Sequence, residues 1–427
     1  MNKEKTGDNQ ALTATEGQSP TRARTRTSGA AWRQTLLIPL LAIITALILS
    51  GILIVATDLE VINAFTSSRK PVVGLQAAWK SISVAYAALF EGSLGNPATI
   101  VAALRAWMAG DPSLLPTAFY PLTESLVTTT PYILVGLAVA LSFRAGLFNI
   151  GAEGQYFMGG LFSVFVGYSL KGLPAFVHLP LTILAGIVGG GLWGAIPGFL
   201  KATTGAHEVI NTIMMNYIAF ALSDWLLNGP MKRPGGYRPI SPEIQPSAML
   251  PSLFPSPMRF HAGFFVALAC AALVYGLLFK TTTGFELRTV GANPRGARYA
   301  GINLTRNFVL AMFLSGGLAG LAAANEIMGL IHYMPNAFSA GYGFDSIALA
   351  LLGRSHPVGV VLAALLFGTL RAGATRMQSV AQIPLDIISI LQAMIIIFIA
   401  APEIIRALYR LQGEREAGEL FTRGWKA

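Results

Sequence analysis

The chain has little charge. Only 12% of its 427 residues are Asp, Glu, Lys or Arg, while 53% are hydrophobic, and a typical soluble domain carries about 25% charged residues. So few charges could not keep the surface dissolved in water. Several apolar stretches also approach the roughly 20 residues that cross a bilayer as a helix. The composition therefore predicts an all-α, polytopic membrane protein.

Cysteine and histidine are scarce as well. The single cysteine, Cys270, excludes disulfides and cysteine clusters within the chain. The five histidines are scattered, and Asn211 stands where the helical zinc motif that begins at His207-Glu208 would need its second histidine. No spacing suits a Ser–His–Asp set. We expect no metal site, no catalytic residue and no enzyme activity.

A phosphate-binding loop is also missing. Residues 314–317 (LSGG) imitate the start of a nucleotide-binding signature of ATPases, but they lie inside an apolar stretch. The chain contains no Gly-Lys dipeptide and hence no Walker loop. We expect this chain to hydrolyse no ATP and to hold no cofactor of its own.

The charges that are present are mostly basic and lie outside the apolar stretches. The net charge is +10, and the basic residues cluster in loops and terminal segments. This is the pattern of the positive-inside rule, in which Lys and Arg favour the cytoplasmic side of a membrane. It favours membrane lipid over nucleic acid as the partner of these charges.

The apolar stretches predict about ten transmembrane segments with both termini in the cytoplasm. The segments at 344–352 and 358–370 are short, which indicates broken or re-entrant helices. We expect a disordered basic cytoplasmic tail at 1–35, a membrane domain at 36–401 and a cytoplasmic tail at 402–427. Within the domain, 57–120 is interpreted as an external connection with interfacial helices. The predicted segments are 36–55, 122–143, 150–168, 179–200, 209–227, 262–279, 308–327, 344–352, 358–370 and 385–401.

Two loops test this topology by their charge. Residues 280–306 hold five basic residues and one acidic residue, as a cytoplasmic loop should. Residues 229–260 are placed outside by the count of segments, yet they hold four basic residues and one acidic residue. This second loop goes against the rule.

Glycine is arranged with a helical period in one segment. Gly186, Gly190, Gly194 and Gly198 recur every four residues, so they form a smooth stripe that a second helix can approach closely. Two Gly-rich segments, 151–160 and 341–353, each precede a segment that starts with proline, at 180 and 357. This faint likeness would suit an inverted repeat, although chance similarity accounts for it equally well.

Polar side chains within the predicted segments are costly in a bilayer. They suit either the lining of a solute path or hydrogen bonds between helices, and as a group they favour a path. Glu208 lies three residues before Asn211, so the two share a helix face. The candidate path residues are Asn149, Glu153, Gln155, Glu208, Asn211, Asn216, Asn325, Glu326 and Asp345.

The loop at 280–306 contains a short helix whose two ends are both specified. Asn293 is a good N-cap, Pro294 suits the first helical position, and Gly301 suits the left-handed residue after a helix. Arg295 and Arg298 then lie on one face. Such definition favours a docking helix for a cytoplasmic partner, with a surface helix beside anionic lipid as the alternative.

The segment 284–302 (GFELRTVGANPRGARYAGI) resembles the cytoplasmic coupling loop of permease subunits in ABC importers. Segments 146–155 (GLFNIGAEGQ), 208–217 (EVINTIMMNY) and 347–353 (IALALLG) resemble the branch of that family associated with nucleosides and basic membrane lipoproteins. The Asp-Leu-Ser-Val-Gly motif usual in ribose and other simple-sugar permeases is absent. The resemblance covers roughly residues 120–400.

This resemblance implies a permease of the bacterial inner membrane that forms a path for nucleosides. Its partners would be cytoplasmic ATPase subunits that use ATP, a second permease subunit (a different chain or a second copy of this one) and an external solute-binding protein. A simple-sugar ABC permease and an ion-gradient-driven secondary transporter stay open as alternatives. The coupling residues implied are Glu286, Gly291, Asn293, Pro294, Arg295, Ala297, Arg298 and Gly301.

Overall fold

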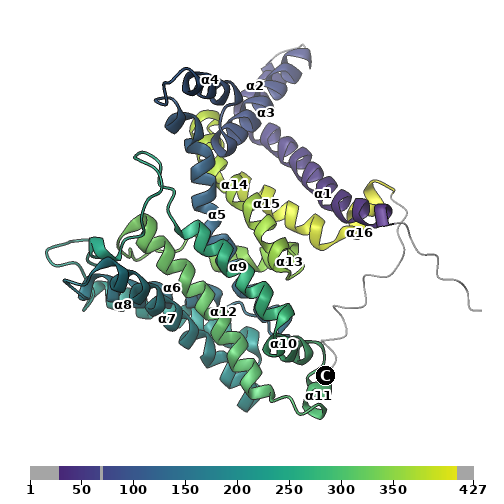
Figure 1. The fold of residues 1–427 in the computed structure, drawn as a ribbon. Coiled ribbons are helices and arrows are strands. Elements are labelled where there is room, and N and C mark those ends of the chain that lie inside the picture. The colour runs from purple at the N-terminus through teal and green to yellow at the C-terminus, as the bar shows by residue number, and fades with distance from the viewer. Residues whose placement is uncertain (1–27, 68–70, 411–427) are drawn as a thin grey trace, which may run out of the picture.

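The computed structural model describes residues 28–67 and 71–410, and the regular elements in this part of the chain are helices (Figure 1). Two isolated β-bridges, Ile240 with Pro335 and Ser252 with His261, occur in its loops. The α-helices are α1 (Ser28–Thr57), α2 (Leu59–Ser67), α3 (Pro71–Leu94), α4 (Pro97–Met108), α5 (Leu115–Arg144), α6 (Ala152–Ser169), α7 (Ala175–Thr204), α8 (Glu208–Asn228), α9 (Gly263–Lys280), α10 (Thr282–Ala292), α11 (Pro294–Tyr299), α12 (Leu304–Glu326), α13 (Tyr342–Leu352), α14 (Pro357–Ala381), α15 (Leu385–Ala400) and α16 (Pro402–Leu408). A 3-10 turn at Pro246–Ala248 and a π-helical turn at Ile327–Ile331 complete the set.

Seven stretches of the described residues are long and apolar enough to cross a membrane. An eighth results if α15 and α16, bent by 86° at their junction, count as one span. The prediction of an all-α, polytopic membrane protein is thereby confirmed. Three of the ten predicted segments correspond to α6, α8 and α13, which fall short of the same criterion in length or hydropathy. The prediction that 358–370 is a short, broken or re-entrant segment is wrong, because these residues belong to the continuous helix α14, which is long enough to cross. The figure of about ten crossings stays a prediction.

The two described ends of the chain lie together. The hydroxyl of Thr45 in α1 is 2.9 Å from the hydroxyl of Tyr409, just beyond α16. Helix α1 begins at Ser28, so the last residues of the predicted tail at 1–35 are helical. The rest of that tail, and most of the predicted C-terminal tail, lie outside the described residues. The cytoplasmic placement of both termini stays a prediction.

The region at 57–120 forms α2, α3, α4 and the start of α5 at one end of the bundle (Figure 1). Helix α3 packs along α14, and an ion pair of 2.9 Å joins Glu91 of α3 to Arg376 of α14. Helix α4 starts as expected for a capped helix, because the side chain of Asn96 accepts a hydrogen bond from the Ala98 amide and Pro97 takes the first position. Trp107 of α4 is exposed. Pro71–Met108 is one of the seven stretches that are long and apolar enough to cross a membrane, and the external placement of this region stays a prediction.

Helix α5 is the core of the bundle. It contacts α3, α9, α12, α13 and α14, and Tyr132, Leu137 and Leu141 are each at most 1% exposed. A helix that is hydrophobic on all sides lies either among other helices or in the membrane, and neighbouring helices cover residues 129–142 of α5. Because α5 ends at Arg144, it also positions the turn that leads into α6.

Helices α7 and α12 cross through their glycines. A Cβ atom built on Gly190 would lie 2.8 Å from the Cα of Gly320, and one on Gly198 would lie 2.9 Å from the Cβ of Met312. Both distances are shorter than side chains tolerate, so only glycine fits. The predicted glycine stripe is confirmed, and its partner includes Gly316 of the false nucleotide signature, which serves helix packing.

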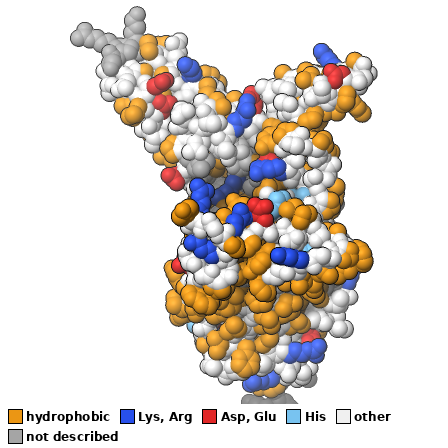
Figure 2. All heavy atoms as spheres, turned by 90° about the vertical axis from the view of Figure 1, so that its left-hand side faces the viewer, with side chains coloured by type: hydrophobic (Ala, Val, Ile, Leu, Met, Phe, Trp, Pro, Cys, Tyr) orange, Lys and Arg blue, Asp and Glu red, His pale blue; other side chains and the backbone are white. Residues whose placement is uncertain are grey.

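An apolar band lies on one face of the bundle. Figure 2 shows it on the face that carries α7 and α8, with Lys and Arg side chains above and below. Exposed hydrophobic residues such as Leu184, Leu192 and Met214 contribute to it. Such a band, bounded by charges, is what a lipid-facing surface requires. It fits the multi-pass membrane character inferred from composition.

The basic loop at 229–260 lies at the opposite end of the bundle from α11 (Figure 1). Its charges are partly used within the protein. Arg233 pairs with Glu243 at 3.2 Å and lies over the ring of Tyr333, while Arg259 pairs with Glu124 of α5. Arg233 and Arg259 thus have a structural role within the protein besides any role in orienting the loop. This role accounts for basic residues in a loop where the positive-inside rule does not expect them.

Candidate functional site: coupling segment and solute pocket

The segment formed by α10 and α11 has the local structure that its sequence predicts. The side chain of Asn293 accepts a hydrogen bond of 3.0 Å from the Gly296 amide, Pro294 takes the first helical position, and Gly301 has a φ of +80°. The side chain of Thr281 caps α10 in the same way, with a bond of 3.1 Å from the Gly284 amide. The predicted short helix with both ends specified is confirmed.

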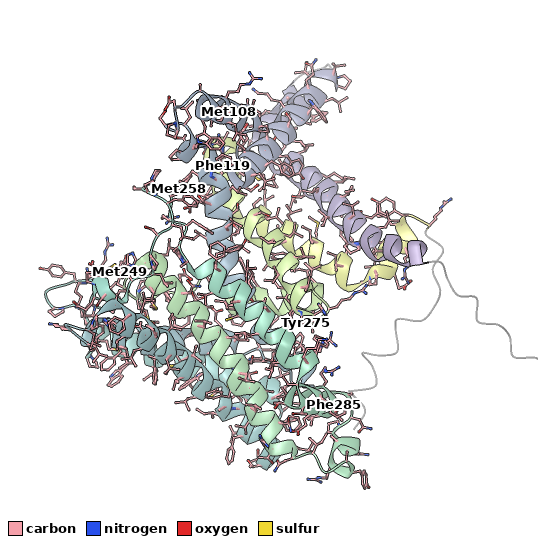
Figure 3. The ribbon with its side chains drawn as sticks, viewed as in Figure 1. Met108, Phe119, Met249, Met258, Tyr275 and Phe285 are labelled. Atoms are coloured by element: carbon pink, nitrogen blue, oxygen red, sulfur yellow. The ribbon has the colours of Figure 1, made fainter. Side chains whose placement is uncertain are left out.

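Helix α11 presents most of its surface to the surroundings. Only Ala297 is buried, and it fixes the helix to the bundle, whereas Arg295, Arg298 and Tyr299 are exposed. Phe285 of α10 is exposed at the same end, far from Met108 and Met258 at the other (Figure 3). An exposed, basic and rigid projection suits a protein surface that docks on a partner.

The coupling segment rests on the turn between α5 and α6. A Cβ atom on Gly146 would lie 2.8 Å from the Cα of Gly291, so the two backbones touch. Gly146 also has a φ of +74°, which favours glycine. Nearby, Arg144 and Arg288 both lie against the ring of Phe279, at 5.7 and 5.2 Å from its centre. Glu286, one of the predicted coupling residues, accepts a bond of 3.1 Å from Asn307, which joins α10 to α12.

Four of the predicted path residues lie in internal hydrogen bonds. Asn149 bonds to Gln155 and to Ser315, each at 2.9 Å. Asn216 of α8 accepts a bond of 2.8 Å from the Gly154 amide and donates one of 3.0 Å to the Ile150 carbonyl. These side chains satisfy the backbone where α6 begins and fix it to α8 and α12. The fourth, Asn325, donates a bond of 3.0 Å to the Gly263 carbonyl.

Two other predicted path residues lie at the start of α8. Glu208 forms an ion pair of 2.8 Å with Lys201 at the end of α7. The next turn of α8 carries Asn211, whose buried side-chain nitrogen has no hydrogen-bond partner among the described residues. Both residues therefore lie where α7 leads into α8.

The three remaining path residues, all carboxylates, gather with tyrosines that the sequence did not single out. Tyr132 donates a bond of 2.8 Å to Asp345, and Tyr156 donates one to Glu326. The ring of Tyr342 lies 5.0 Å from that of Tyr132 and 5.8 Å from that of Tyr156. The tyrosines stand in apolar stretches, where an aromatic residue gives no sign of a polar partner.

Two further contacts complete this cluster. Arg371 of α14 lies 3.5 Å from the carboxylate of Asp345 and donates a bond of 3.0 Å to the Ala340 carbonyl. Glu153, in the first turn of α6, accepts a bond of 2.6 Å from the Gly343 amide in the first turn of α13. The N-terminal end of α13 thus meets a carboxylate, as the partial positive charge at a helix start favours.

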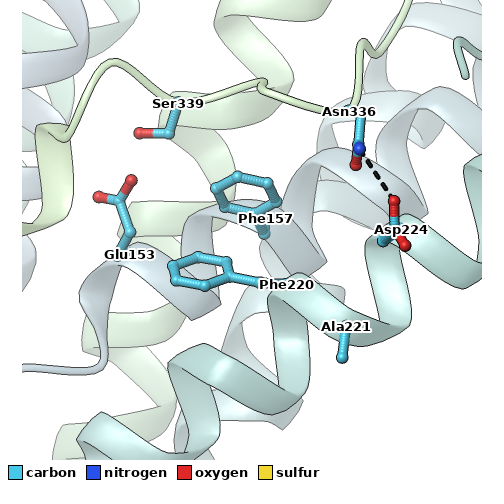
Figure 4. Close-up of a pocket in the computed structure, with 7 residues that line it drawn as sticks. All are labelled: Glu153, Phe157, Phe220, Ala221, Asp224, Asn336 and Ser339. Carbon is cyan, nitrogen blue, oxygen red and sulfur yellow. Dashed lines mark hydrogen bonds between the residues drawn. The ribbon is translucent and has the colours of Figure 1, made fainter. Parts of the chain in front are cut away.

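A pocket of about 460 Å³ opens beside this cluster. It lies between α6, α8 and the segment that precedes α13, and Figure 4 shows its lining. Of the nine predicted path residues only Glu153 lines it. The lining residues are Glu153, Phe157, Phe220, Ala221, Asp224, Asn336 and Ser339.

Residues 122–400 match the family of the branched-chain amino acid transport system, permease component. The chain belongs to this family. As a permease component it is a multi-pass protein of the inner membrane. It works within an ABC transport system, whose other parts are in general an ATPase and a solute-binding protein. The predicted family and localisation are confirmed. Among the described residues no group of three metal-binding side chains is found.

Three similar proteins carry informative names. The guanosine ABC transporter permease protein NupP of Bacillus subtilis is 44% identical over 67% of this chain and 83% of its own length. The glucose permease protein TsgB13 of Haloferax volcanii is 38% identical over 67% and 78%. The nucleoside permease protein NupB of Lactococcus lactis is 34% identical over 67% and 80%. No solved structure matches the chain.

Proposed function

We propose that this permease forms the transmembrane path of an ATP-driven importer for nucleosides. The likeness to a guanosine permease over most of the shared domain carries the proposal. A glucose permease is also similar, so a simple sugar is the second candidate. A pocket with two phenyl rings favours the planar base of a nucleoside over a sugar alone.

The exposed helix α11 would receive the movement of a separate ATPase subunit. Arg295 and Arg298 supply a basic surface that suits an acidic groove on such a partner. The remaining coupling residues, from Glu286 to Gly301, form the two capped helices and their attachment to the bundle. In this role ATP is used by the partner, and the permease contributes only the docking surface.

The structure offers a short route from α11 to the pocket. Movement of α10 would press Gly291 against Gly146, where the backbones already touch. The turn there continues into α6, whose start is held by Asn149 and Asn216. The first turn of α6 carries Glu153, which lines the pocket. Rigid elements in contact can carry such a displacement, because packed interfaces shift between discrete arrangements.

The partners proposed for this path are an ATPase subunit on α11, a second permease subunit and an external binding protein. The second permease would be a different chain or a second copy of this one. The membrane band of Figure 2 contacts lipid, and no nucleic acid is involved.

The test is uptake of labelled guanosine into proteoliposomes that hold the complete transporter with its binding protein. We expect uptake to require ATP and to be reduced by unlabelled uridine or guanosine, but not by ribose or glucose. Competition by the sugars without competition by nucleosides would replace the substrate. Uptake that persists without ATP and stops when a proton or sodium gradient is removed would contradict the ATP-driven mechanism.

A further inference from the structure

The pocket between α6 and α8 has two polar ends and an apolar middle. Glu153 and Ser339 lie on one side, and Asp224 and Asn336 lie on the other (Figure 4). The rings of Phe157 and Phe220 lie between them. Its volume of about 460 Å³ falls in the range of roughly 300–1,000 Å³ that small-molecule sites occupy.

The apolar middle consists of two phenyl rings. Phe157 and Phe220 lie edge to face, with their centres 4.9 Å apart. The ring of Phe338 also lies edge to face with that of Phe157, with their centres 6.1 Å apart, which helps to hold Phe157 in place. Phe157 is only 7% exposed, whereas Phe220 is half-buried. A rigid ring beside an accessible one forms a surface on which a flat aromatic ligand can stack.

Both polar ends are rich in hydrogen-bond acceptors. Asp224 is oriented by bonds of 2.9 Å from Asn336 and 2.8 Å from Asn228. Glu153 is 3% exposed and accepts the Gly343 amide with one carboxylate oxygen. The carboxylate of Glu153 lines the pocket together with the side chain of Ser339. Carboxylate oxygens accept more than one hydrogen bond each, so both ends can receive donors from a ligand.

The described residues that line the pocket include two carboxylates and no Lys, Arg or His. A ligand that brings hydroxyl and amino donors would satisfy these acceptors. A phosphate would instead place negative charge beside the carboxylates without a cation to compensate it, and an unpaired charge is costly to bury.

We propose that this pocket is a nucleoside subsite of the permease itself, which stacks the base against Phe220 and Phe157, binds hydroxyl and amino donors through Glu153 and Asp224, and rejects phosphorylated nucleotides. The proposal rests on the nucleoside importer proposed above and adds the residues that contact the solute. It also assigns selectivity between nucleosides and nucleotides to the permease, in addition to any that a binding protein provides.

The experiment uses 8-azidoguanosine as a photoreactive probe on the complete transporter in lipid nanodiscs, without the binding protein. Labelled peptides are identified by mass spectrometry. We expect label on the peptides that contain Phe157 and Phe220, suppressed by guanosine but not by GMP. Phe220→Ala should reduce labelling about tenfold, because stacking on one aromatic ring commonly contributes a factor of this order.

Two variants sharpen the result. Phe165→Ala removes a ring from the exposed surface of α6 outside the pocket, and it should label like the unaltered protein. Asp224→Asn removes one negative charge with little change in shape, so GMP should begin to suppress labelling. Assembly of each variant with the ATPase, checked by size-exclusion chromatography, shows that the variant is folded.

The outcomes separate this proposal from the proposed function. If the unaltered transporter imports guanosine but the label maps elsewhere, or Phe220→Ala labels normally, the subsite is wrong and the importer stands. If GMP competes as well as guanosine does, the selectivity is wrong. If no nucleoside is imported, both proposals fail.

Discussion

The coupling segment and the pocket region are built by opposite means. In the coupling segment, Asn293 and Gly296 lie within one turn of each other, and α11 projects from the bundle with little more than Ala297 buried. Around the pocket, the bonds join residues far apart in the chain, such as Tyr132 with Asp345 and Glu153 with Gly343. The predicted docking element is thus specified by its own local sequence, whereas the pocket region is specified by the fold.

The largest loss of transport and stability is expected where the two regions meet. Gly291→Val would place a side chain 2.8 Å from backbone atoms of Ala145 and Gly146, which cannot give way as a side chain could. We expect loss of transport together with a stability loss of about 1–3 kcal/mol, measured as uptake and as the melting temperature of the purified complex.

The control for this change is Gly276→Val in α9, where nothing lies within 4 Å of an added Cβ atom. This variant should transport and melt nearly as the unaltered protein does. Equal behaviour of the two variants would show that the contact between Gly291 and Gly146 does not join the regions.

The next largest effect concerns coupling without stability. Changing both Arg295 and Arg298 to Glu reverses the charge of exposed side chains. We expect solute-stimulated ATP hydrolysis to disappear while membrane insertion and melting temperature stay unchanged, because neither side chain supports the bundle. Lys171→Glu, in the exposed loop between α6 and α7, is the control. Normal stimulation in the double variant would remove the docking role of α11.

A moderate effect is expected at the polar support of α6. Asn149→Ala removes bonds to Gln155, to Ser315 and to the Gly151 amide, all of them buried. Buried partners left without a hydrogen bond cost about 1–3 kcal/mol. We expect a lower melting temperature of the protein, whereas the local structure of α11 should not change. A melting temperature equal to that of the unaltered protein would mean that water replaces the amide, and the network would then not hold α6.

The smallest effect should remain confined to α11. Asn293→Ala removes the acceptor for the Gly296 amide, a loss of roughly 1 kcal/mol, which corresponds to about fivefold faster hydrogen exchange at that amide. Asn293→Ser keeps an acceptor and should exchange nearly as the unaltered chain does. Faster exchange that spread to α6 would contradict the separation of the two regions.

The same contrast explains which features the sequence could predict. The caps of α11 were predictable because Asn293, Pro294 and Gly301 act on neighbouring backbone atoms. The glycine stripe on α7 predicted a close helix contact but not its partner, since Gly316 and Gly320 become neighbours only through the fold. The sequence alone therefore predicts which face of α7 is packed closely, but not which helix packs against it.

The pocket was less accessible to prediction for a related reason. A buried amide that supports packing and a carboxylate that lines a cavity look alike in an apolar stretch. Of the predicted path residues, Glu153 lines the pocket, whereas Gln155, two positions later, bonds within the protein. Phe220 and Asp224 carried no signal, because a ring and an acid near a helix end are equally common on a lipid or loop surface.

The crossing of α7 and α12 has a consequence for how the protein is made. Helices α8, α9, α10 and α11, with a long loop among them, are synthesised between the two partners. Until α12 enters the membrane, the glycine face of α7 lacks the helix that it crosses. A contact between distant segments forms late because the intervening chain must first be placed. We therefore expect the glycine face of α7 to stay incompletely packed during synthesis until α12 inserts against it.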